Sequence, residues 1–266
     1  MLNELRSDVR EMMTEQVEYR ELLYQMTVRD LRLRYKQTIM GFGWAIFMPL
    51  LNTAIFSVIF MRVAPIDTGV PYPVFAYCGL LTWNFFASSL KFAVNSLTTN
   101  TNLVTKVYFP REVFPFSAVI VSLVDFAVGA IVLVALMAWY RVGTSETALF
   151  LPVIVLVQIA FTMGIALLLA MGNLFYRDVK YLFEVVVTAW MFATSVVYPV
   201  ELVGGRLGVL MRLNPMTPII EAYRDVLLLD RLPGLPFAGA AIVSVLMLGI
   251  AWVAFHRAEF QFAENI

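Results

Sequence analysis

The sequence has few of the side chains on which most enzymes rely. Its 266 residues include one cysteine, Cys78, and one histidine, His256. One cysteine excludes an intramolecular disulfide and a cysteine metal cluster, and one histidine is too few for a histidine-based metal site. The motifs GxxxxGK(S/T), HExxH and GxSxG are absent, which excludes a phosphate loop and two common hydrolase sites. We therefore expect no catalytic residue, no metal site and no cofactor bound by this chain.

Charge is also scarce, whereas long hydrophobic runs are abundant. Charged residues make up 14% of the sequence and hydrophobic residues 61%, and the mean hydropathy is +0.80. The formal net charge is zero, so no overall field favours nucleic acid as a partner. This composition lies well outside the range of soluble globular proteins and indicates a protein embedded in membrane lipid.

Six apolar runs predict six transmembrane helices, because a helix needs about 20 residues to cross the hydrocarbon core of a bilayer. The runs are residues 37–61, 68–90, 113–140, 147–176, 185–200 and 232–255. The fifth is shorter than a full crossing needs. The predicted fold is an all-α integral membrane protein. Its transmembrane domain is residues 41–257, with a cytoplasmic N-terminal segment at 1–40 and a short cytoplasmic tail at 258–266.

A basic segment directly before the first run sets the orientation. Arg29, Arg32, Arg34 and Lys36 lie there, and positive charge beside a first span tends to stay cytoplasmic. We therefore expect a multi-pass protein of the inner (cytoplasmic) membrane with both termini in the cytoplasm.

The same N-terminal segment contains an amphipathic helix. Its apolar residues recur at helical spacing: Tyr19, Leu22, Leu23, Met26 and Leu33. The stripe fits a helix packed on the rest of the protein, or an interfacial helix lying along the inner leaflet. The adjoining basic residues favour the interfacial helix.

Two polar segments interrupt the apolar runs. In residues 95–115, we expect a short helix that Thr98, Thr99 or Asn100 caps, that runs through Lys106 and that Pro110 ends. Residues 200–233 are long for a structureless loop and predict two short helices joined at NPMTP. In the second helix, Thr217 would be the N-cap. We expect this pair to dip back into the outer leaflet as re-entrant helices.

Asp125 is the clearest ionisable residue at mid-membrane depth. Placing an aspartate there costs about 2.5–3.5 kcal/mol on insertion scales, so it needs a polar partner or water. One interpretation is a structural hydrogen bond to another helix, at Asn52, Ser88 or Ser195. The other is a polar group that lines a pore. The sequence leaves both open.

Three stretches together resemble the permease subunit of type-2 ABC exporters of the polysaccharide-export family, which export O-antigen, capsule and teichoic-acid chains. They are RDLRLRYKQTIMGFGWAIFMP (29–49), NLVTKVYFPREVFP (102–115) and NPMTPIIEAYRD (214–225). FYRDVKYLFE (175–184) and the C-terminal AEFQFAENI give further support. The resemblance spans nearly the whole chain. It implies a homodimer with two copies of a separate nucleotide-binding ATPase subunit, which binds ATP and Mg²⁺, so this chain itself is not an enzyme.

The resemblance also implies roles for particular residues. The expected ATPase-coupling residues are Asn100, Asn102, Leu103, Lys106, Val107, Arg111, Glu112, Arg29 and Arg32. The expected outer gate is Asn214, Pro215, Pro218, Glu221 and Arg224. Aromatic ring faces suit the apolar faces of sugars, and the expected translocation channel is lined by Trp44, Phe47, Asp125, Trp190 and Tyr198. The expected function is ATP-driven export of lipid-linked polysaccharide from the cytoplasm to the outer side of the inner membrane, in contact with membrane lipid.

Three alternatives remain, one within the exporters and two from other classes. A type-2 ABC exporter of a smaller glycolipid or drug would share the same architecture. A membrane-embedded glycosyl- or acyltransferase would need a reactive group of residues that the sequence does not offer. A passive channel or structural membrane protein would need no ATPase. An adjacent ATPase gene with a phosphate loop would separate an exporter from the last two.

Overall fold

The computed structural model describes residues 14–36, 40–41, 43–106, 109–143 and 145–262. All regular secondary structure in these ranges is helical, which confirms the predicted all-α class. The longer helices are α2 (Arg20–Tyr35), α3 (Gly43–Val58), α4 (Tyr72–Ser96), α6 (Val113–Trp139), α7 (Leu151–Phe175), α8 (Val179–Phe192), α10 (Met216–Leu228) and α11 (Leu235–Ala258). The shorter elements are η1 (Ile59–Val63), η2 (Thr98–Asn100), α5 (Thr101–Lys106), η3 (Glu146–Phe150), η4 (Val200–Leu202), α9 (Gly205–Leu213) and η5 (Glu259–Gln261).

Four helical segments in the described residues are long and apolar enough to cross a membrane: Gly43–Val63, Val113–Trp139, Glu146–Phe175 and Leu235–Gln261. They correspond to the first, third, fourth and sixth predicted spans. Helix α4 has 25 residues, about 38 Å at 1.5 Å per residue, but its composition falls outside this set. Helix α8 has 14 residues, about 21 Å. Length and composition therefore identify a multi-pass membrane protein without fixing six spans.

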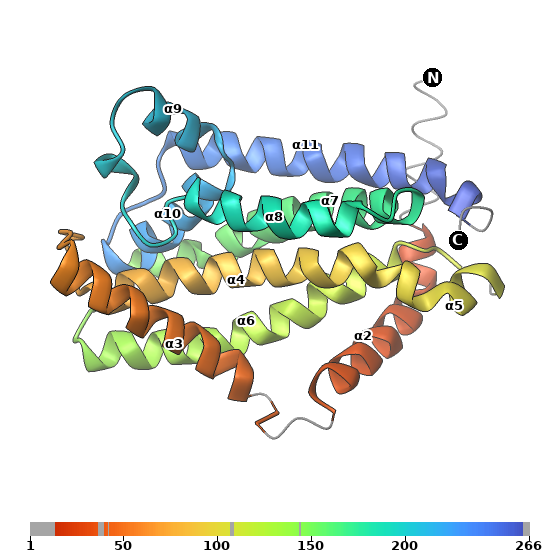
Figure 1. Cartoon of the computed structure of the whole chain (residues 1–266), viewed down its shortest axis with the longest axis horizontal. Coiled ribbons are helices and arrows are strands. Elements are labelled where there is room, and N and C mark those ends of the chain that lie inside the picture. Colours follow the sequence, from red (N-terminus) through yellow and green to blue (C-terminus); the bar gives the residue numbers. More distant parts are fainter. Residues whose placement is uncertain (1–13, 37–39, 42, 107–108, 144, 263–266) are drawn as a thin grey trace.

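Helix α4 is the centre of the bundle. It contacts α3, α6, α7, α8 and α10 and lies between them in Figure 1. Its most deeply buried large side chains are Tyr77, Leu80, Phe86 and Leu90. Because neighbouring helices rather than lipid surround most of α4, it can carry polar residues that a lipid-facing helix would not tolerate.

Buried polar side chains tie α4 to its neighbours. Gln158 of α7 donates to the carbonyl of Thr82 at 2.9 Å and accepts from the Tyr223 hydroxyl of α10 at 2.7 Å. Asn173 of α7 donates to the carbonyl of Val94 at 2.7 Å. Away from water such groups are costly unless paired, so these bonds fix how α7 and α10 pack on α4.

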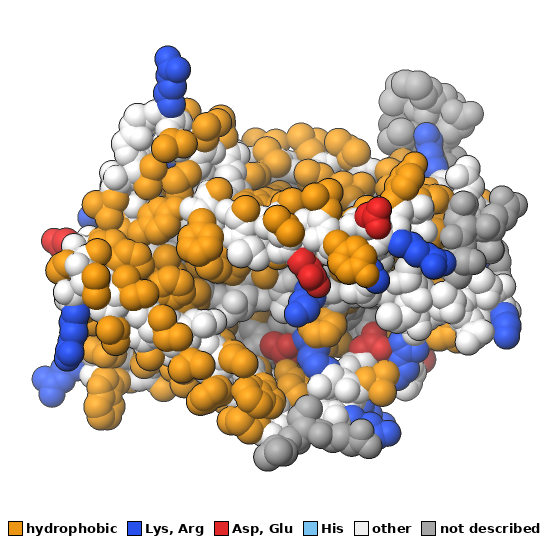
Figure 2. All heavy atoms as spheres, in the orientation of Figure 1, with side chains coloured by type: hydrophobic (Ala, Val, Ile, Leu, Met, Phe, Trp, Pro, Cys, Tyr) orange, Lys and Arg blue, Asp and Glu red, His pale blue; other side chains and the backbone are white. Residues whose placement is uncertain are grey.

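The two ends of the bundle differ. Helix α5, one end of α2 and the last turns of α11 lie at one end, and α9 and α10 lie at the other (Figure 1). On the face in Figure 2, charged side chains gather mainly over the α2 and α5 end, with a few at the opposite tip, and the area between is mostly hydrophobic. This distribution is what a membrane-embedded bundle requires.

Helix α2 packs against α6. Met26 is buried in a hydrophobic cluster, and Tyr19, Leu22 and Leu23 pack on it. Leu33 is 60% exposed, so the predicted stripe is buried only in its first part. Of the two interpretations, a helix packed on the rest of the protein therefore describes the part of α2 around Met26.

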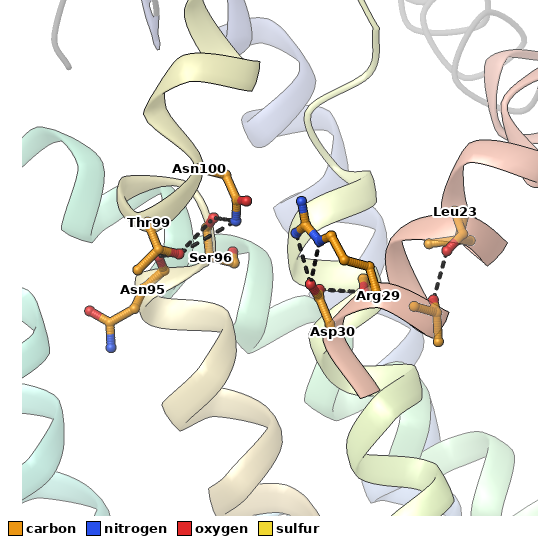
Figure 3. A network of polar contacts seen from close by, with 9 residues as sticks. Leu23, Arg29, Asp30, Asn95, Ser96, Thr99 and Asn100 are labelled. Carbon is orange, nitrogen blue, oxygen red and sulfur yellow. Dashed lines mark hydrogen bonds and ion pairs between the residues drawn. The ribbon is translucent and has the colours of Figure 1, made fainter. Parts of the chain in front are cut away.

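Two predicted helix caps are wrong. The side chains of Thr99 and Asn100 donate to the last carbonyls of α4, those of Asn95 and Ser96, instead of capping α5 (Figure 3). Thr98 also donates to the carbonyl of Asn95. They terminate α4, because carbonyls at a helix end lack intrahelical donors.

The second wrong cap concerns Thr217. Helix α10 begins at Met216, two residues before the Pro218 start that a Thr217 cap implies, and Asn214 Oδ1 accepts from the Met216 N–H at 3.2 Å. Asn214 therefore satisfies a free amide at the helix start, and Thr217 lies inside the first turn. The two short helices joined at this segment are present as α9 and α10.

Candidate functional site

A cavity of about 570 Å³ lies between α3, α4, α6 and α8. Aromatic and polar side chains line it together: Trp44, Asn52, Asn84, Phe85, Lys91, Asp125, Phe126, Phe183 and Glu184. Ring faces beside hydrogen-bonding groups suit a ligand that has both apolar faces and hydroxyl groups, as sugars do. Two of the predicted channel residues, Trp44 and Asp125, lie on this cavity.

Asp125 also binds the end of α2. Arg34 and the Tyr35 hydroxyl each donate to its carboxylate, and the Arg34 guanidinium lies 3.7 Å from the centre of the Phe92 ring. The suggested partners Asn52, Ser88 and Ser195 are wrong. Asn52 and Ser88 line the same cavity without a bond to Asp125, and Ser195 lies in the segment after α8, where its carbonyl accepts from Arg224. The structural and the cavity-lining interpretation of Asp125 are thus both compatible with its position.

The other predicted channel residues lie elsewhere. Phe47 is 44% exposed and packs edge-on against Trp44 at 5.9 Å between ring centroids. Trp190 packs against Phe86 at 5.1 Å. Trp190 and Tyr198 line a separate, mainly apolar cavity of about 600 Å³ between the end of α8 and α9.

Asn214 joins the predicted outer gate to α8. Its side chain accepts from Trp190 Nε1 at 3.0 Å and donates to Thr194 Oγ1 at 2.8 Å. Pro215 lines the same cavity, whereas Pro218 is buried in α10. Glu221 lines a further cavity of about 460 Å³ together with Asp67 and Glu201. The structure therefore divides four of the five predicted gate residues between two cavities, since Arg224 also lines the second one.

Arg224 is the most deeply embedded arginine in the described residues, at 3% exposure. It donates to the carbonyls of Ser195 and Val196, both at 2.6 Å, and its guanidinium stacks on the Phe75 ring at 3.6 Å. The planar fork of arginine can hold two carbonyls at once. Arg224 therefore attaches the segment after α8 to α10 and α4.

Gly79 makes room for this attachment, and we expect Gly79→Ala to destabilise the fold. A β-carbon at Gly79 would lie 2.1 Å from the Val196 carbonyl oxygen and 2.3 Å from Arg224 Nη2. Overpacking of this kind costs about 1–3 kcal/mol, so the midpoint of thermal unfolding in detergent should fall.

The matched control for this prediction is Gly239→Ala in α11, where nothing lies within 4 Å of the added carbon. This variant should unfold at or slightly above the wild-type temperature, since alanine favours a helix over glycine. Equal unfolding temperatures for both variants would contradict the steric argument.

The predicted ATPase-coupling residues lie mainly around α5. Asn102 and Lys106 are exposed, Asn100 and Leu103 are half-buried, and Val107 falls outside the described residues. Val104, between them, is fully buried. Helix α5 therefore has one side anchored in the bundle and one side open to a partner.

The two remaining basic coupling residues lie on α2. Arg32 is exposed, whereas Arg29 pairs with Asp30 at 2.7 Å. Asp30 in turn accepts from Ser117 of α6 at 2.8 Å. Of these two arginines, Arg32 is therefore the one that lies at the surface with no acidic partner on α2.

Arg111 and Glu112 bind the end of α11, a contact that sequence reasoning missed. Arg111 Nη1 donates to Glu259 Oε1 at 2.9 Å, and His256 Nδ1 lies 3.3 Å from Glu112 Oε1. The contact was missed because pairing between residues so far apart in the sequence has no periodic signature. The only hint in the sequence was the C-terminal stretch AEFQFAENI, which contains Glu259.

This group also contains potential metal ligands. One atom each of Glu112, His256 and Glu259 lies within 4.8 Å of the others. The Arg111 guanidinium already binds Glu259 and supplies positive charge there. A second cation beside it would be repelled, so the arrangement favours direct ion pairs.

The fold and cavities define a multi-pass, all-helical membrane protein with a partly exposed loop helix, α5, and a cavity lined by aromatic and polar side chains. Residues 21–228 match the family profile of the ABC-2 type transporter. The chain belongs to this family of transporter membrane subunits.

Curated relatives are similar to the chain over most of its length. The O-antigen export system permease protein RfbA of Myxococcus xanthus is 33% identical over 257 residues, which cover 95% of this chain and 98% of the relative. A Klebsiella pneumoniae protein of the same name is 28% identical and covers 92% and 94%. The polysialic acid transport protein KpsM of Escherichia coli is 22% identical and covers 76% and 79%.

Proposed function

We propose that this chain is the transmembrane subunit of an ATP-driven exporter that moves lipid-linked polysaccharide from the cytoplasm to the outer side of the inner membrane. The observation that carries the proposal is the near full-length similarity to O-antigen export permeases. The cavity lined by Trp44, Phe85, Asp125 and Glu184 supports it, because its rings and polar groups suit sugar units.

Energy for transport must come from a partner, because the sequence has no phosphate loop. We place two copies of an ATPase subunit, with ATP and Mg²⁺ bound to them, against α5. Its exposed Asn102 and Lys106 are available for contact, and the buried Val104 holds the helix to the bundle. The exposed Arg32 of α2 would add a second contact.

The topology that fits this function has six spans with both termini in the cytoplasm. Helices α4 and α8 would join the four segments that are long and apolar enough to cross by themselves. The bundle end with α2, α5 and the end of α11 would then be cytoplasmic. Helices α9 and α10 would be re-entrant from the outer side, where Asn214 and Arg224 hold them to α8 and the segment after it.

A homodimer would provide the channel. One subunit offers a cavity of about 570 Å³, which is too small to enclose a polymer across about 30 Å of hydrocarbon. Helices α3 and α8 both expose large apolar side chains, among them Phe47, Ile55, Tyr181 and Val185. Two such faces opposite each other would extend the cavity into a continuous path between subunits.

Deleting the gene tests the proposal. We expect lipid-linked polysaccharide to be made but retained on the cytoplasmic side, and surface polymer to return when the wild-type gene is supplied. Inactivating the partner ATPase should give the same phenotype. The measurement is surface polymer by antibody or lectin against total lipid-linked glycan.

Two outcomes would contradict the proposal. Normal surface polymer in the deletion strain, with no second exporter present, would exclude polysaccharide export. Intracellular retention of a short glycolipid instead of a polymer would assign the chain to export of a smaller lipid-linked substrate.

A further inference from the structure

We propose that Glu259 and His256, at the end of α11, are positioning residues for the loop between α4 and α6 (residues 97–112, here the coupling loop), and that they make this loop and α11 move as one body. The inference rests on the proposed function, since it concerns how work from an ATPase reaches the membrane helices. It assigns a role to two residues outside the loop itself.

Arg111 joins three parts of the chain at one point. Its Nη1 donates to Glu259 Oε1 at 2.9 Å, and its backbone N–H donates to the same oxygen at 3.2 Å. Its Nη2 lies 3.4 Å from the carbonyl of Val104 in α5. One arginine thus connects the loop helix α5, the start of α6 and the end of α11.

Glu112 makes the second connection. It is 1% exposed, and its Oε1 lies 3.3 Å from His256 Nδ1. Its Oε2 is buried without a hydrogen-bond partner among the described residues. A carboxylate this buried cannot reach a separate ATPase subunit. Any effect of Glu112 on coupling must therefore pass through the residues around it.

A layer of apolar side chains lies beside these charged groups and makes the contact between the loop and the end of α11 rigid. Phe255 and Phe262 pack at 5.0 Å between ring centroids, and Phe109 packs on Phe114 at 5.5 Å. These rings and Val104 belong to one buried cluster. Packed interiors resist deformation, so a push on α5 displaces the end of α11 with it.

Helix α11 can then transmit the displacement to the opposite end of the bundle, where α9 and α10 lie. It packs along α7 and also contacts α10, whose Arg224 holds the segment after α8. A displacement of α11 along its axis would reach the helices at the far end of the bundle, seen on the left in Figure 1. This path begins at the contacts of Arg111 with Glu259 and of Glu112 with His256.

Charge reversal and charge exchange test the proposal in the full permease with its native ATPase in membranes. The variants are Arg111→Glu, Glu259→Arg and the two combined. Each single reversal should lower polymer exported per ATP hydrolysed by about tenfold, a usual size for energetic coupling between sites. The exchange should restore about half of the wild-type ratio, since residues in contact are not additive.

The control variant is Glu146→Arg, an exposed position in η3 outside this group, which should keep the wild-type ratio. If both single reversals reduce the amount of permease in the membrane, Glu259→Gln, which keeps an acceptor for Arg111, is compared with Glu259→Leu. The glutamine variant should export more polymer per ATP, and equal ratios would overturn the proposal.

The remaining outcomes separate this inference from the proposed function. If the wild-type complex exports no polymer, the proposed function fails. If it exports polymer and the single reversals match it, only the inference fails. Loss of coupling with a zinc-selective chelator in excess Mg²⁺, reversed by added Zn²⁺, would overturn the direct ion pairs if the chelator has no effect on His256→Gln. It would make Glu112, His256 and Glu259 a metal site.

Discussion

Replacing Arg224 with methionine should lower the stability of the fold more than any other single substitution outside the cavity between α3, α4, α6 and α8. Methionine replaces the apolar stem of arginine but has no donor, so the carbonyls of Ser195 and Val196 would lose their 2.6 Å partners in a buried site. Hydrogen bonds to a charged group contribute about 1.5–3 kcal/mol each. The expected loss is therefore roughly 3–6 kcal/mol for the two bonds, measured as a fall in thermal unfolding midpoint in detergent.

A graded series sharpens this prediction. Arg224→Lys keeps the charge but not the planar fork, so its stability should lie between those of the wild type and Arg224→Met. Arg206→Met, at an exposed position of α9, is the matched control and should change little. If Arg224→Met unfolds at the same temperature as that control, the arginine does not hold the segment after α8.

Asp125→Leu should release α2 from α6. The carboxylate accepts from Arg34 and Tyr35, and the Arg34 and Asp125 side chains are 13% and 20% exposed. Removing one partner of a largely buried ion pair costs on the order of 3 kcal/mol, because the other charge is left unpaired. We expect a lower unfolding midpoint and greater accessibility of a cysteine placed at Met26, measured with a thiol reagent in the Cys78→Ser background.

The double variant Arg34→Leu, Asp125→Leu separates the ion pair from the cavity. With no charge left unpaired, it should recover much of the stability lost in Asp125→Leu. Export by the stable double variant would mean that Asp125 serves to hold α2. Loss of export with restored stability would mean that its charge is needed on the cavity wall. A double variant as unstable as the single one would contradict the pairing.

The loop between α4 and α6 (residues 97–112) shows how much local sequence signals can predict. Turn and helix chemistry in residues 95–115 correctly predicted a short helix that reaches Lys106, and it placed Asn102 and Lys106 in that helix. The cap was wrong because Thr98, Thr99 and Asn100 can serve either the helix before them or the one after them. The choice depends on how the chain turns, which is a tertiary property.

The cavity and the charge partners could not be predicted for a different reason. Trp44 and Asp125 come together only through the packing of α3 and α6, while Trp190 turns inward onto Phe86. A hydropathy run says that a helix is apolar, not which of its sides faces a neighbour. The same limit hid the contact between Arg111 and Glu259.

What the sequence determined by itself is the membrane class, the all-helical fold and the absence of a nucleotide-binding loop, because each follows from composition or local pattern. Hydrophobic length forces helices in lipid, since every backbone amide must find a partner within its own segment. The tertiary structure alone decided that α4 lies at the centre, that Asp125 binds Arg34, and that Arg224 and Arg111 bind residues distant in sequence. Such pairings depend on a few side chains that meet at one distance and angle, and no periodicity along the chain records where they meet.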